Sequence, residues 1–294
     1  MKYYFFAFLL FTISTNVKSQ ESETEKTIAS LKQKIATSQK AEKLRWMDSL
    51  SNYIAFETAF ENDSMVKATS QFAISLDSFN IAIHHTANQI YYLTNIKGTP
   101  EEAKKLYLST RKYLPRVTLA EAKCKFYYDA GNTYFYLRDF STALQLYDSI
   151  QYLSSQTKTG KYLGLSKMAK GQVYTDMGDF GKASLELQDA IRYYQTNKDT
   201  LGLVGARNSL VILYSKNRFF KEAKQERDQL IAISLMQEDY NSLPALYYNA
   251  AADQRKTKDI KARIRYLNKA LEATYKSKYK EYYEPIMLSG LVLA

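Results

Sequence analysis

Cysteine, histidine, glycine and proline are all scarce in this chain of 294 residues, which has one, two, ten and four of them. A single cysteine excludes a disulfide framework, an iron–sulfur cluster and a cysteine-rich zinc site. The two histidines, His84 and His85, are adjacent, and side chains about 100° apart on a helix cannot easily share a metal. We expect both to lie on the surface or in a groove. Composition therefore indicates no enzyme, no cofactor and no metal.

Long apolar runs are also missing, apart from a short one near the start. Phe5 to Ile13 is apolar, follows Lys2 and precedes a polar stretch that ends at Ser19. This is the layout of a secretory signal peptide, and it is too short for the roughly 20 residues that span a bilayer. We expect residues 1–19 to be removed and the protein to be exported, either periplasmic or membrane-associated and facing the periplasm. The alternative is a buried N-terminal helix.

The chain instead has a repeat of forty residues. Tyr134, Tyr174 and Tyr214 are equally spaced, and Phe140, Phe180, Phe220 and Ile260 form a parallel column, as do Ala143, Ala183 and Ala223. Within one copy, Ala143, Tyr147 and Ile150 share one helical face. A turn with an aspartate, which can cap the next helix, separates two such helices. Each copy is therefore a helical hairpin, and only a stack of hairpins buries their apolar faces.

These landmarks resemble the tetratricopeptide repeat. The shared features are a small residue three before tyrosine (Gly131 and Tyr134), the Asp139-Phe140 turn and Ala143 of the second helix. The resemblance covers roughly residues 94–280. It implies an all-α fold, an α-solenoid of stacked helix-turn-helix hairpins. The usual period of this family is about 34, so we expect longer helices or loops here, including a loop that begins at Ser154.

The repeat divides the chain into four parts. Residues 1–19 are the signal peptide, 20–83 an N-terminal helical or capping region, and 84–283 about five repeats. Residues 284–294 match the start of a further repeat, as if the chain were truncated; the alternative is a membrane segment that begins there.

The resemblance also implies a concave groove lined by the first helix of each hairpin. A mixture of aromatic and amide side chains suits an extended or helical peptide. The expected groove residues are Tyr128, Asn132, Tyr136, Met168, Gln172, Thr175, Ile212, Tyr248 and Arg255.

Positive charge gathers near the end of a chain whose net charge is +11. Residues 255–280 hold ten Lys or Arg and two acids. This segment is suited to anionic lipid headgroups or an acidic partner; the alternative is a basic face that only water contacts. No base-reading motif is present, so we expect no specific nucleic-acid contact.

We expect a non-catalytic module that binds a protein or peptide. The layout resembles the exported sensor region of bacterial LuxR-type or histidine-kinase regulators, in which repeats precede a membrane helix and an output module. This rests on analogy of architecture. Two alternatives stay open: a free-standing periplasmic scaffold or assembly protein, and a cytosolic peptide-sensing regulator.

Overall fold

The structure, a computed structural model, describes residues 23–57, 63–157 and 160–293, and the regular elements in these ranges are all helices. None of the described helices is long and apolar enough to cross a bilayer. The expected signal peptide lies outside the described residues.

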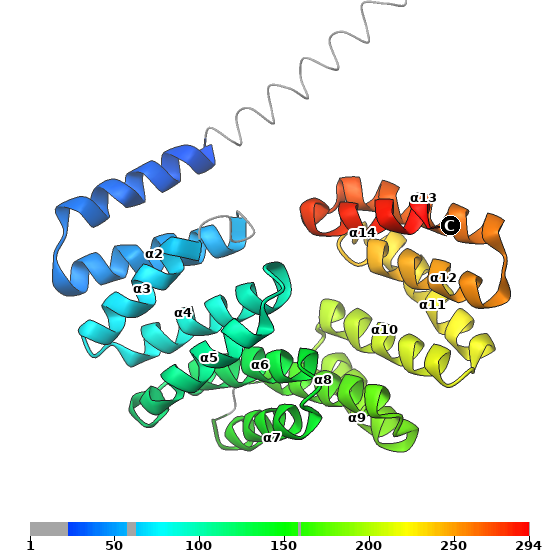
Figure 1. Cartoon of the computed structure of the whole chain (residues 1–294), viewed down its shortest axis with the longest axis horizontal. Helices are drawn as coiled ribbons and strands as arrows, with labels where there is room; N and C mark the ends of the chain where they lie inside the picture. Colours follow the sequence, from blue (N-terminus) through cyan, green and yellow to red (C-terminus); the bar gives the residue numbers. More distant parts are fainter. Residues whose placement is uncertain (1–22, 58–62, 158–159, 294) are drawn as a thin grey trace, which may run out of the picture.

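A helix over residues 23–37 precedes the labelled helices in Figure 1. The labelled elements, with a π-helix η1 and a 3₁₀ helix η2 among them, are α2 (Lys40–Glu57), α3 (Asp63–Ser75), α4 (Phe79–Tyr91), η1 (Tyr92–Ile96), α5 (Pro100–Thr110), η2 (Arg111–Arg116), α6 (Ala120–Tyr136), α7 (Phe140–Thr157), α8 (Lys161–Met177), α9 (Phe180–Thr196), α10 (Thr200–Lys216), α11 (Phe220–Met236), α12 (Leu243–Thr257), α13 (Ile260–Lys276) and α14 (Lys280–Val292).

Helix length explains the period of forty. Helices α8 to α11 each have 17 residues, joined by connections of two or three residues. The prediction of a loop that begins at Ser154 is wrong, because α7 continues to Thr157. Two of the expected boundaries, after residue 83 and after residue 283, fall inside α4 and α14. Both helices are continuous, so the chain is not divided at these positions.

The hairpins stack into an arc whose two ends face each other (Figure 1). First helices touch first helices: α6 contacts α8, α8 contacts α10, and α10 contacts α12. This row forms the inner wall of the arc. The second helices, α7, α9, α11 and α13, pack behind it.

The turns inside the hairpins share one geometry. Arg138, Gly178, Arg218 and Lys258 have φ between 59° and 80°, the left-handed conformation that ends a helix. The aspartates expected as caps do cap: Asp179 Oδ1, for example, accepts from the Lys182 backbone N–H at 3.0 Å.

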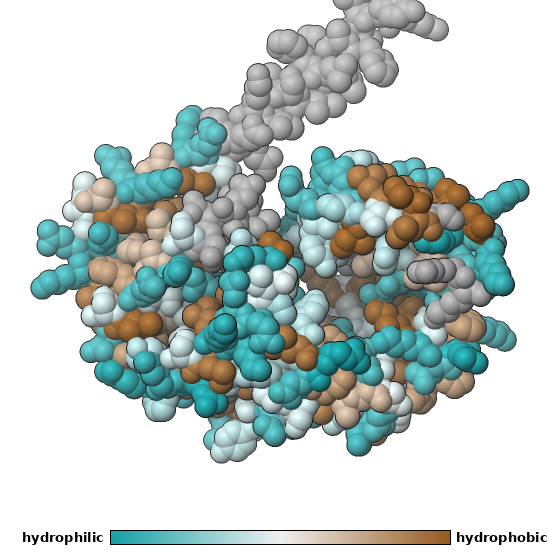
Figure 2. Space-filling model, viewed as in Figure 1, coloured by the Kyte–Doolittle hydropathy of each residue, from teal (hydrophilic) through white to brown (hydrophobic). Residues whose placement is uncertain are grey.

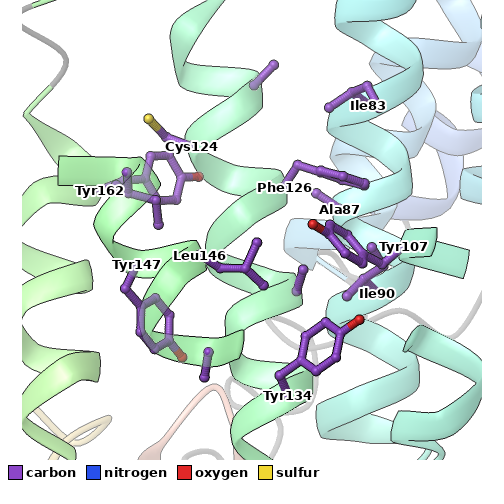
Figure 3. Packing of buried hydrophobic residues seen from close by; sticks show 14 of the residues in the cluster. Ile83, Ala87, Ile90, Tyr107, Cys124, Phe126, Tyr134, Leu146, Tyr147 and Tyr162 are labelled. Atoms are coloured by element: carbon purple, nitrogen blue, oxygen red, sulfur yellow. The ribbon is translucent and has the colours of Figure 1, made fainter. Parts of the chain in front are cut away.

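The core lies where the two helices of a hairpin meet. Gly131 of α6 lies against Tyr147 of α7, and a Cβ added there would be 2.5 Å from the tyrosine ring. Figure 3 shows Tyr147, Tyr134 and Phe126 packed in one apolar cluster. Cys124 is buried in the same cluster, where it packs as a small apolar side chain.

The N-terminal helices are held to the solenoid by polar contacts. His85 is fully buried, and its Nε2 lies 2.6 Å from Asp48 Oδ1 of α2. His84 Nε2 lies 3.1 Å from Asn52 Oδ1. The expectation that both histidines lie on the surface or in a groove is therefore wrong for His85, because the helical repeat carries it into the contact between α2 and α4.

Candidate peptide-binding groove

Side-chain hydrogen bonds connect the first helices along the inner wall. Gln172 Nε2 of α8 donates to Ser209 Oγ of α10 at 3.0 Å. Asn249 Nδ2 of α12 donates to Asn208 Oδ1 of α10 at 3.1 Å. Each bond joins residues about one repeat apart in sequence. The wall is therefore cross-linked before any ligand arrives, which lowers the entropy cost of binding.

A small pocket opens in this wall between α6, α8 and α10. Its volume is about 180 Å³, and the lining residues are Phe135, Gln172, Thr175, Asp176, Ser209 and Ile212. A cavity of about 150 Å³ holds a benzene ring, so the pocket admits one aromatic or branched aliphatic side chain. Figure 2 shows that the molecule is hollowed between its two ends, with hydrophobic residues visible inside.

Polar atoms surround the apolar floor of this pocket. Phe135 and Ile212 supply apolar surface, while the Gln172 amide and the Ser209 hydroxyl supply donors and acceptors. Asp176 forms an ion pair with Lys216 across α8 and α10. A peptide needs both kinds of group, because its backbone amides must keep hydrogen-bond partners when its side chain leaves water.

Tyrosines continue the wall on the N-terminal side of the pocket. The ring of Tyr128 lies 6.2 Å from that of Tyr147 and 6.1 Å from that of Tyr162. Tyr147 Oη donates to Asn132 Oδ1 at 2.7 Å, so this amide supports the wall. Burial raises the pKa of Tyr128 to about 12, which keeps the phenol neutral at ordinary pH.

A carboxylate lies behind these rings. Asp129 is buried, and its Oδ2 accepts from Lys125 Nζ at 2.8 Å. Burial raises the pKa of Asp129, and the ammonium of Lys125 opposes that effect. The Asp129 carboxylate is therefore held by Lys125 near these tyrosines, and its burial keeps it from contacting a ligand.

Tyr91, at the end of α4, interacts electrostatically with tyrosines from distant parts of the chain. Burial raises the pKa of Tyr91 to about 12, with smaller contributions from Asp129, Tyr279, Tyr282 and Tyr136. Residues of α4, α6 and α14 are therefore electrostatic neighbours although far apart in sequence. Tyr91 immediately precedes the π-helical turn η1, an irregularity that is frequent at functional sites.

The structure brings some of the expected groove residues together and separates others. Gln172, Thr175 and Ile212 line the pocket. Met168 is half-buried and packs against the clusters between α8 and α10. Tyr248 is partly exposed on α12 and lies away from the pocket. The side chain of Arg255 lies outside the part of the chain whose side chains are described.

Sequence reasoning missed Phe135, Asp176 and Ser209. The repeat itself held the signal for two of them. Phe135 is forty residues before Thr175 and occupies the same column. Tyr136, which was expected in the groove, is in the column of Asp176; its side chain is exposed and does not line the pocket.

Comparison with solved structures identifies the fold. A signal-transduction ATPase with numerous domains (STAND) and a tetratricopeptide repeat sensor, from Pyrococcus horikoshii, matches with a TM-score of 0.61 and 17% identity over 93% of this chain and 43% of that one. BtubC (BKLC) from P. vanneervenii matches at 0.50, with 15% identity over 86% and 91% of the two chains. A putative kinesin light chain of nearly identical tetratricopeptide-like repeats, from Podospora anserina, also matches at 0.50, with 15% identity over 69% and 98%.

The fold is a tetratricopeptide-like α-solenoid. No family model and no curated protein matches the sequence, and at these identities the likeness shows the fold alone. The chain spans less than half the length of the Pyrococcus protein. In such a solenoid the inner wall of first helices is the surface that the stacking leaves concave, and the pocket lies in that wall.

Proposed function

We propose that this chain is a non-catalytic module that binds an extended peptide, or an extended segment of a protein, along its inner wall. One observation carries the proposal: three residues expected from sequence to contact a ligand, Gln172, Thr175 and Ile212, line one pocket of about 180 Å³. The pocket would hold one apolar side chain of the peptide. Gln172 and the neighbouring Ser209 would bond its backbone.

The experiment is a selection of peptides from a random display library on the purified chain, followed by affinity measurements. Ile212→Arg fills the pocket with a charged side chain and should weaken the selected peptides at least about tenfold, the effect of losing one buried apolar anchor. Leu185→Arg is the matched control, since Leu185 is 64% exposed on α9 behind the wall; it should leave affinity unchanged.

Two safeguards keep the result informative. Phe135→Ala enlarges the pocket instead of filling it and should also weaken binding, so the conclusion does not depend on one variant. Each variant is compared with the parent by its thermal melting temperature. Peptides that bind both groove variants as tightly as the parent would contradict the proposal, as would a library that yields no binder.

We further propose that the module is exported and is the sensor part of a signalling regulator. The signal-peptide layout of residues 1–19 supports export, and the Pyrococcus neighbour, itself described as carrying a tetratricopeptide repeat sensor, offers a precedent in architecture. Fractionation of native cells with an antibody to the repeats tests this. A membrane band well above 33.9 kDa agrees with it. A soluble envelope band near that size favours a free-standing scaffold, and a cytosolic band favours a cytosolic regulator.

A further inference from the structure

The outer face of α13 carries a stripe of positive charge. Lys261, Arg265, Lys269 and Lys276 follow one another at intervals of four or seven residues, and all four are exposed. The buried residues of this helix, Leu267 and Ala270 among them, face the opposite way. The stripe therefore points out of the solenoid, and Lys278 extends it past the end of the helix.

The cations of this stripe lack the carboxylate partners that a lysine of an earlier repeat has. Lys170 of α8 contacts both Asp148 and Glu186. By contrast, among the residues the structure describes, no carboxylate oxygen lies within 4.0 Å of the five stripe cations. One acid, Glu272, lies on the same face. The positive charge is left unneutralised.

Tyrosine rings take the place of the missing carboxylates. Lys269 Nζ lies 5.7 Å from the ring centre of Tyr247, and Lys276 Nζ lies 4.8 Å from that of Tyr240. Such contacts hold a cation in place and leave its charge available to an anion. The stripe is a pre-ordered row of cations rather than a mobile basic tail.

Apolar side chains border the stripe on one side. Ile264 is 39% exposed and Tyr275 is 53% exposed, and both lie on α13 beside the cations. At about 1.5 Å per residue, the 17 residues of α13 make a straight edge of roughly 25 Å. The 180 Å³ pocket lies elsewhere, on the inner wall, and none of the stripe cations lines it.

We propose that the outer face of α13 docks the protein on an anionic bilayer surface. Lys and Arg are attracted to anionic headgroups, while tyrosine and exposed aliphatic side chains settle at headgroup depth. A straight row of cations bordered by apolar side chains fits a planar surface that presents anions above an apolar layer. This docking is independent of peptide binding in the groove, which faces the other way.

Flotation with vesicles tests the proposal on the purified chain. We expect binding to phosphatidylcholine vesicles that contain phosphatidylglycerol, little binding to phosphatidylcholine alone, and release at about 1 M salt, where screening acts within about 3 Å. The variant Lys261→Glu, Arg265→Glu and Lys269→Glu should lower binding at least about tenfold.

The control changes the net charge equally but off the stripe. Lys105→Glu, Lys112→Glu and Lys221→Glu alter three exposed lysines on other helices and should keep most of the binding. Equal loss in both triple variants would overturn the proposal, because net charge alone would then explain it. Equal binding to neutral vesicles, or binding to polyglutamate or RNA without binding to vesicles, would also overturn it. Ile212→Arg should leave flotation unchanged.

Discussion

Two glycines of the inner helices should respond oppositely to the same substitution. A Cβ added at Gly171 would be 2.6 Å from Leu187 Cγ and 3.4 Å from the Ala183 carbonyl oxygen, and both of these residues are fully buried. In Gly171→Ala, overpacking should lower the free energy of unfolding by about 1–3 kcal/mol. The higher helix propensity of alanine offsets about 1 kcal/mol of this loss. A Cβ at Gly205 meets only Met168 Sδ, at 3.6 Å. Gly205→Ala should therefore stabilise by up to about 1 kcal/mol.

A double-mutant cycle isolates the close contact. Leu187→Ala alone should cost about 2–5 kcal/mol, but in that background Gly171→Ala no longer meets the leucine and should stabilise. The coupling between the two sites should be about 1–3 kcal/mol. Urea-unfolding midpoints followed by far-ultraviolet circular dichroism measure all variants. Additive effects at Gly171 and Leu187, or equal shifts for Gly171→Ala and Gly205→Ala, would refute this packing of α8 on α9.

Three further predictions follow from buried and capping groups. Asp259→Ala removes the cap of α13 and should lower the free energy of unfolding by about 1 kcal/mol, measured by urea titration. Arg227→Ala removes the buried guanidinium that pairs with the Asp253 carboxylate and should cost about 3–5 kcal/mol, whereas Arg227→Leu with Asp253→Ala should recover most of that loss in a melting experiment. Burial lowers the pKa of His84 from 6.5 to about 4. Between pH 6.5 and about 4 the unfolded chain therefore binds a proton at His84 that the folded chain does not bind. The free energy of unfolding should fall as the pH drops through this range, and it should fall less in His84→Gln.

Periodic features of the sequence determined most of the fold. The forty-residue columns locate the hairpins because alanine and glycine recur wherever two helices approach closely, as Gly131 does against Tyr147. The aspartate turns followed from the same columns, and Asp259 does accept from the Ala262 backbone N–H. Where a repeat departs from the pattern, as with Ser154 inside α7, local composition gave no sign that the helix continued.

The site was less predictable because it depends on neighbouring repeats. Gln172 and Ile212 share a column, so repeat logic could place both on the inner wall. The bond from Gln172 to Ser209 joins different columns and depends on how far α8 and α10 are rotated, which the columns do not encode. The neighbourhood of Tyr91 and Tyr282 depends on the curvature of the whole stack, to which every hairpin adds a small rotation.

The most direct test of the account is to locate the bound peptide. A photoreactive benzoylphenylalanine replaces Phe135, which lines the pocket, or Tyr152, which is 65% exposed on the outer helix α7. We expect a covalent adduct between a selected peptide and position 135 and none at position 152. An adduct at position 152 alone, or at neither position while the peptide stays bound, would contradict binding in the groove.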